Sequence, residues 1–257
     1  MIQEIKNGYV KTETHNGITT IEFFHPQSNS LPHKILDELA HAIHGAGNER
    51  DTRVIVLRSS GQGAFCAGAS FDELSAISTK EEGLQFFSGF AHVINAMRKC
   101  PKFIIARIHG KCVGGGVGLA AAADYAIATE GADVKLSELA IGIGPFVVGP
   151  AVERKIGSAA FGHLSIDATM WRSADWAKRK GLFAELHSTP TDMDESIERL
   201  SHSLAHSSPD AMHELKLVLW KGTDHWDQLL AERAAISGRL VLSTFSKNAI
   251  ASLRKKV

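Results

Sequence analysis

The 257-residue sequence predicts an α/β fold in which strands and helices alternate along the chain. First, short apolar runs typical of buried strands precede segments whose apolar residues recur at helical spacing. Second, the order strand, strand, helix recurs at least twice before residue 140, without a fixed-period sequence repeat. Third, a hydrophobic content of 44% with 22% charged residues is typical of a globular domain.

The first half of the chain supplies most of the predicted strands. Asn16-Gly17 marks the tight turn of a hairpin, because this dipeptide tolerates the positive φ angles that such turns require. The elements predicted after it are a helix at 31–47, a strand at 52–60, a glycine-rich loop at 61–70, helices at 71–77 and 81–100, a strand at 101–110, a helix at 117–124, and short strands at 125–130 and 133–138.

The second half is predicted to be mostly helical from about residue 151. A strand-like segment ends the stretch 173–187, and amphipathic helices follow at 197–220 and 226–253. We therefore expect two parts, an α/β core at 1–195 and a helical C-terminal region at 196–257. The apolar stripe of that region must be buried either on the core or on a neighbouring subunit.

Charge and cysteine content exclude several classes of protein. Lys and Arg together number 28, as do Asp and Glu, so no net charge favours binding to nucleic acid or to an anionic membrane. Three cysteines without paired spacing indicate a reducing compartment. The polar start lacks a secretory signal, and the weakly polar run 139–152 is too short to span a bilayer. We expect a cytoplasmic protein.

The stretch "HGKCVGGGVGLAAAAD" at 109–124 places three glycines between a predicted strand and a predicted helix. Such a helix start presents unpaired N–H groups, and glycine lets a ligand approach them closely. One hypothesis is a dinucleotide site, although the spacing lacks the required last glycine or alanine, since Leu119 stands there. A second is a tight turn for close packing. A third is an oxyanion hole, with a second donor from the glycine-rich loop at 61–70.

Two separated motifs carry a family resemblance. "GAFCAGASFDEL" at 63–74, followed by the glycine triplet and "KLSELAIGIGP" at 135–145, resembles the crotonase superfamily of enoyl-CoA hydratases and isomerases. The early segment "HPQSNSLPHKILDELAHAI" resembles the same family. The resemblance implies a spiral of strand-strand-helix units with a helical C-terminal trimerisation region. It also implies acyl-CoA thioester substrates and a homotrimer or hexamer.

The resemblance also assigns site residues. Ala69 and Gly115 match the two backbone oxyanion donors, and Glu138 matches an acid/base glutamate. The expected CoA contacts are Ala67, Ala69, Phe71, Gly114 and Gly115. Because CoA is part of the substrate, no separate cofactor and no metal is expected.

One departure from the family pattern bears on the reaction. Hydratases of the family carry a further glutamate where this chain has Gly118. With Glu138 alone, a 1,3 proton shift is simpler than hydration, so we expect enoyl-CoA double-bond isomerisation. Hydration of a straight-chain or branched substrate such as methylglutaconyl-CoA, using a modified second group, remains open. So do a lyase or decarboxylase reaction, a non-catalytic acyl-CoA binding subunit and a nicotinamide dehydrogenase.

Other reactive side chains carry weaker hypotheses. Cys112 lies near His109 in sequence and Cys66 lies in the glycine-rich loop, but buried structural cysteines are common. The histidine pairs 41/44 and 202/206 lack a third metal ligand in a known motif. The C-terminal lysines could contact CoA phosphates, although solvated charge is the default at a chain end; they are Lys247, Lys255 and Lys256.

Overall fold

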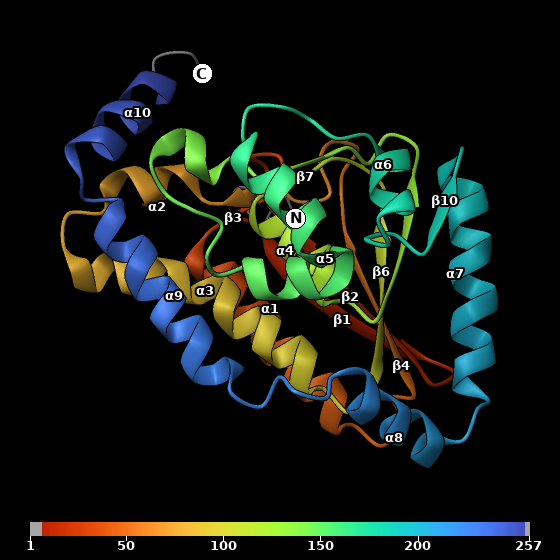
Figure 1. Cartoon of the computed structure of the whole chain (residues 1–257). Helices are drawn as coiled ribbons and strands as arrows, with labels where there is room; N and C mark the ends of the chain where they lie inside the picture. The colour runs from red at the N-terminus through yellow and green to blue at the C-terminus, as the bar shows by residue number, and fades with distance from the viewer. Residues whose placement is uncertain (1–6, 255–257) are drawn as a thin grey trace.

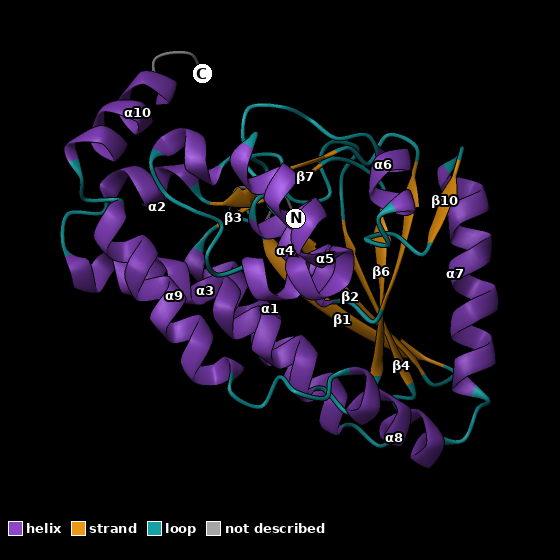
Figure 2. Ribbon diagram, viewed as in Figure 1, coloured by secondary structure: helices purple, strands orange, loops and turns teal. Residues whose placement is uncertain are grey.

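A computed structural model describes residues 7–254. Its centre is a six-stranded sheet in the order β1-β2-β4-β6-β8-β10, antiparallel between β1 and β2 and parallel elsewhere. The sheet is orange in Figure 2, with helices on both sides. Its strands are β1 (Tyr9–His15), β2 (Ile18–Phe24), β4 (Val54–Ser59), β6 (Phe103–Ile108), β8 (Tyr125–Thr129) and β10 (Glu185–His187). The predicted α/β class is confirmed.

Two small parallel sheets lie apart from the large one, β3 (Ser30–Leu31) with β5 (Gly68–Ala69) and β7 (Cys112–Val113) with β9 (Val134–Lys135). The helices are α1 (His33–Asn48), α2 (Phe71–Ala76), α3 (Lys80–Lys99), α4 (Gly115–Ala122), the short 3-10 helix η2 (Glu138–Ile141), α5 (Gly149–Ile166), α6 (Ala174–Arg179), α7 (Pro190–Ala205), α8 (Pro209–Leu219), α9 (Trp226–Leu240) and α10 (Thr244–Arg254).

Alternate residues of the parallel strands enter two different cores, since side chains on a strand point to opposite faces. On β4, Ile55 and Leu57 join the large core, while Val54 and Val56 join a smaller one. The smaller core is closed by α7, through Met193 and Ile197. Burial on both faces explains why these strands are continuous apolar runs in the sequence.

The C-terminal helices pack on the rest of the chain. α7 lies along the outer face of the sheet, and α9 runs beside α3 (Figure 1). Gly83 and Gly238 meet at that crossing, where an added Cβ on Gly83 would lie 2.7 Å from the Cα of Gly238. The predicted division between residues 195 and 196 falls inside α7, and it remains a prediction.

Several predicted boundaries differ from the structure. The strand expected at 133–138 is shorter, because β9 pairs with β7 over only two residues and Glu138 then begins η2. The helix expected at 197–220 is interrupted before α8, which Ser208 caps and Pro209 begins. The hairpin at Asn16-Gly17 is confirmed, with φ of 49° and 80°. Within residues 7–254, none of the helices combines the length and apolarity that a bilayer crossing requires.

Candidate active site

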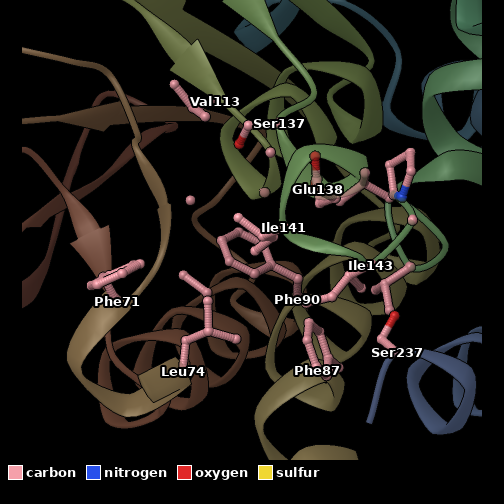
Figure 3. A pocket seen from close by; sticks show the side chains of 18 of the residues that line it. Phe71, Leu74, Phe87, Phe90, Val113, Ser137, Glu138, Ile141, Ile143 and Ser237 are labelled. Atoms are coloured by element: carbon pink, nitrogen blue, oxygen red, sulfur yellow. The ribbon is translucent and has the colours of Figure 1, made fainter. Parts of the chain in front are cut away.

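All the site residues predicted from the sequence line one cavity of about 550 Å³ (Figure 3). Its lining is mainly apolar and includes the predicted Ala67, Ala69, Phe71, Gly114, Gly115 and Glu138. These residues come from two glycine-rich turns and η2, which lie far apart in the sequence. A cavity of this size and polarity is typical of small-molecule sites.

Backbone pairing brings the three segments together. Val113 N–H donates to the Cys66 carbonyl at 2.9 Å, which joins the glycine triplet to the loop before Ala69. Gly114 N–H donates to the Lys135 carbonyl at 2.9 Å, which joins the triplet to the segment before Glu138. Short backbone pairing therefore fixes three distant segments around one cavity.

The two predicted oxyanion donors border the cavity from neighbouring turns. Gly115 is the first residue of α4, so its N–H has no acceptor within that helix and lies at the positive end of the helix dipole. A Cβ added to Gly68 would lie 3.7 Å from the Gly115 nitrogen, so the loop before Ala69 approaches the helix start closely. The Ser30 hydroxyl donates to the Ala69 carbonyl at 2.8 Å and restrains that loop.

Each glycine around the helix start has a different close neighbour. Gly114 adopts a positive φ of 52°, and a Cβ there would lie 3.0 Å from Glu138 Oε1. A Cβ on Gly115 would collide with the Phe90 ring, and one on Gly116 with the Cys66 carbonyl. The tight-turn hypothesis therefore accounts for part of the glycine pattern, and ligand access need not explain all of it.

Glu138 is held at the cavity wall by the turn that follows it. Its carbonyl accepts from Ile143 N–H at 3.0 Å, and Gly142, with φ of 79°, ends η2. The residue as a whole is half-buried, but its Oε2 is buried and no described residue donates a hydrogen bond to it. Burial raises the pKa of Glu138 to about 7, partly offset by its own backbone N–H. Near neutral pH the carboxyl group can therefore both accept and donate a proton.

The space beside Gly118 is filled by apolar side chains. A Cβ on Gly118 would lie 2.5 Å from Val148 Cγ1 and 3.6 Å from Ile94 Cδ1. Val148 also lines the cavity, so its side chain stands between Gly118 and the ligand space. Among the described lining residues, Glu138 is the only carboxylate. Within residues 7–254, no second acid lines the cavity in place of the one missing at position 118.

The weaker sequence hypotheses find little support in the described part of the chain. Cys66 and Cys112 are buried and outside the cavity lining, and burial raises the pKa of the Cys66 thiol to about 12. This favours a structural role over a nucleophilic one. Residues 7–254 contain no cluster of three metal-ligating side chains. Lys247 is exposed on α10, and Lys255 and Lys256 lie outside the described residues.

The dinucleotide hypothesis conflicts with the topology. The strands of the main sheet lie side by side in chain order, whereas a dinucleotide site forms where strand order reverses. A dinucleotide site would also need an acid on the ribose, and Glu138, the acid that follows the glycine turn at about the required distance in the sequence, instead faces that turn, as the distance to Gly114 shows.

Sequence reasoning missed several cavity residues that the fold supplies, among them Ser30, Phe90, Val148 and Ser237. Ser30 lies in the segment that carried the early part of the resemblance, so a signal was available for it. Phe90 and Ser237 lie on helices whose inward faces a single sequence does not identify, and Val148 is the residue before α5.

The chain is similar to known proteins of one family. A model of the enoyl-CoA hydratase/isomerase family matches residues 13–254. The mitochondrial methylglutaconyl-CoA hydratase of Rattus norvegicus is 30% identical over 200 residues, covering 76% of this chain and 63% of that protein. The peroxisomal Delta(3,5)-Delta(2,4)-dienoyl-CoA isomerase of Arabidopsis thaliana is 26% identical over 211 residues, covering 76% and 74%.

Other relatives match less of the chain or share only its fold. A (7aS)-7a-methyl-1,5-dioxo-2,3,5,6,7,7a-hexahydro-1H-indene-carboxyl-CoA hydrolase of Rhodococcus jostii is 34% identical over 132 residues, and the match spans only about half of each chain, 51%. The crystal structure of enoyl-CoA hydratase from Bacillus halodurans superposes with a TM-score of 0.87 at 23% identity, covering 95% of this chain and 99% of that one. The family match over nearly the whole chain and the shared crotonase fold lead to one conclusion: the chain belongs to the enoyl-CoA hydratase/isomerase family.

Proposed function

We propose that this protein is an enzyme that moves the double bond of an enoyl-CoA thioester from the 3 to the 2 position. Ala69 and Gly115 N–H groups bind the thioester oxygen, and Glu138 transfers the proton. The observation that carries the proposal is that the Val148 side chain packs against Gly118, where a hydratase of the family has a second glutamate. Glu138 is then the only carboxylate among the described lining residues. Hydration needs one group to activate water and another to protonate carbon, whereas isomerisation needs one group for both transfers.

The reaction proceeds in two proton transfers. The Glu138 carboxylate removes a proton from C2, and the electron pair moves into the thioester carbonyl to form a dienolate. The two N–H groups stabilise the negative oxygen, each by about 2.7–4 kcal/mol in precedents where one donor was removed. The protonated Glu138 then returns the proton to C4, and the double bond forms between C2 and C3. A pKa of about 7 suits a group that must act as base and then as acid.

Hydration is the second candidate, supported by the methylglutaconyl-CoA hydratase relative. In that case the Ser137 hydroxyl, which lines the cavity beside Glu138, would help to hold the attacking water. A non-catalytic acyl-CoA binding subunit would use the same cavity without needing Glu138.

The test is incubation with matched 3-enoyl-CoA and 2-enoyl-CoA thioesters, following absorbance of the conjugated thioester. We expect 3-enoyl-CoA to gain this absorbance, and Glu138→Gln to abolish the gain while acyl-CoA still binds. Loss of absorbance from 2-enoyl-CoA, without any gain from 3-enoyl-CoA, would establish hydration instead. Binding without any change in either thioester would establish a binding subunit.

We also propose a homotrimer or hexamer acting on acyl-CoA in fatty acid metabolism in the cytoplasm. Exposed apolar side chains on one face of α8 support self-association: Leu215, Val218 and Leu219. Light scattering of the purified protein measures the oligomeric state directly, and a monomer would overturn this part of the proposal.

A further inference from the structure

Ser237 is the one residue of α9 that lines the cavity, and it is only 1% exposed. Just past the end of α9, Val241 packs with Ile143 in an apolar cluster that Phe87 borders. In Figure 3, Ser237 lies beyond Ile143 as seen from Glu138, with Phe87 beside it. A hydroxyl group thus stands in an otherwise apolar part of the cavity, away from the proposed acid/base.

Among the described residues, the Ser237 hydroxyl has no hydrogen-bond partner. Most other buried serine hydroxyls do have one: Ser30 with Ala69, Ser196 with Glu185, Ser201 with Glu198, and Ser246 with Ser243. Ser59, which lies outside the cavity lining, is a buried serine without one. Buried polar groups in folded proteins are nearly always paired with protein, water or ligand. An unpaired hydroxyl at the surface of a ligand cavity therefore indicates a polar atom on the ligand.

The charged side chains that line the cavity indicate whether the ligand group that carries this polar atom is charged or uncharged. Lys135 is the only cationic side chain among the described lining residues, and its Nζ lies 5.6 Å from the ring centre of Trp171, which is 39% exposed. Lys135 thus lies at the partly exposed side of the site rather than among the buried phenylalanines. A carboxylate beside Ser237 would be buried with one hydroxyl and with no cationic side chain among the described residues lining that part of the cavity, which is costly; Arg233, one turn earlier on α9, lines a separate pocket. An uncharged oxygen needs only the one hydrogen bond.

We propose that Ser237 determines specificity by hydrogen bonding an uncharged oxygen, a keto or hydroxyl group, on the acyl chain remote from the thioester. This rests on the proposed function only in taking acyl-CoA as the ligand of the cavity. The preferred substrates are then oxygenated acyl-CoA thioesters rather than plain alkyl ones.

Close helix packing is the competing explanation for a small residue at position 237. Gly83 and Gly238 bring α3 and α9 into contact next to it, so a large side chain would not fit. Alanine satisfies that requirement as well as serine does, because it is no larger. Ser237→Ala therefore separates the hydroxyl from the size of the side chain.

The experiment measures binding of saturated acyl-CoA thioesters by calorimetry, so that no turnover is required. One series carries a single keto group moved along the chain, and the reference is the unmodified thioester of equal length. We expect one keto position to bind about tenfold more tightly than the reference, and Ser237→Ala to reduce that ratio to about one. Ser88→Ala is the matched control, because Ser88 on α3 bonds the Leu84 carbonyl outside the cavity lining, and it should keep the ratio.

Three results would overturn the inference. They are equal affinity across the whole series in the unmodified protein, an unchanged ratio in Ser237→Ala, and tighter binding of a thioester that ends in a carboxylate. Failure of the proposed isomerisation is seen separately, as binding without turnover. If no acyl-CoA binds at all, the proposed function and this inference both fail.

Discussion

Replacing Glu138 with glutamine is expected to abolish turnover and yet stabilise the folded protein at alkaline pH. The carboxylate oxygen Oε2 is buried without a hydrogen-bond donor among the described residues, so the charged form lacks the solvation it has in the unfolded chain. Glutamine has nearly the same shape and no charge. Residues kept for chemistry at a cost in stability are common at active sites.

The magnitude follows from the pKa of Glu138. Burial raises it to about 7 from an ordinary value of 4.5, which corresponds to about 3 kcal/mol in favour of the protonated form. Between these two values the folded protein holds more protons than the unfolded chain, so stability falls as the pH rises. The cost is absent below about pH 4.5 and complete above about pH 7. The half-buried position of the whole residue makes 3 kcal/mol an upper figure.

The assay is denaturant unfolding of the unmodified protein and Glu138→Gln at pH 5 and pH 8.5. We expect the variant to gain about 2–3 kcal/mol relative to the unmodified protein between the two pH values, or roughly 5–10 °C in melting temperature for a chain of this size. Comparing two pH values cancels any fixed cost of burying the glutamine amide. Glu195→Gln, exposed on α7, is the control and should show no such gain. A Glu138→Gln variant whose relative stability is the same at both pH values would refute the reasoning.

Three further predictions follow from the same structure. The kcat/KM for 3-enoyl-CoA should rise with pH through about 7, because Glu138 must be charged to remove the first proton; a profile that is flat between pH 6 and 8 would contradict this. Gly115→Ala should destabilise the fold by about 1–3 kcal/mol through collision with the Phe90 ring, and Phe90→Leu should recover part of that loss in a double-mutant cycle of unfolding free energies; additive effects would show no contact. Lys216→Met should cost about 3–5 kcal/mol in urea unfolding, because the buried ammonium lies 2.8 Å from Asp124 Oδ2; a cost below about 1 kcal/mol would show that the pair contributes little.

The sequence predicted the elements whose signals are local. The Asn16-Gly17 turn and the apolar strands are set by backbone conformation and by burial on both sheet faces, and the structure contains them where expected. Element ends were less accurate, because they depend on tertiary contacts. Glu138 was expected on a strand, but the pairing of β9 with β7 stops at Lys135, and the chain turns into η2.

In the site as well, residues that lie in local sequence motifs were predicted, and the tertiary contacts around them were not. The small residues and the glutamate were identified because they lie in recognisable motifs, and the structure places them around one cavity. The sequence did not predict what occupies the space beside Gly118, because side chains from distant parts of the chain fill that space. Val148 and Ile94 fill it, and both come from other helices or turns. No pattern around Gly118 itself indicates this.

The C-terminal region was predicted to bury an apolar stripe and, from the resemblance, to form a trimerisation region, and in the structure it also forms part of the cavity wall. α9 contributes Ser237, α10 contributes Leu253, and Gly142 of the η2 turn lies against Phe245 and Ser246 of α10. The proposed acid/base therefore lies in the middle of the sequence, whereas part of the cavity wall comes from its C-terminal helices. Under the proposed role of Ser237, substitutions at that position of α9 alter which acyl chain binds without touching the oxyanion hole or Glu138, whereas substitutions at Phe245 or Ser246 of α10 also reach the η2 turn. In the proposed mechanism, the glycine turns and η2 determine the reaction, and residues outside the sequence motifs determine which acyl chain binds.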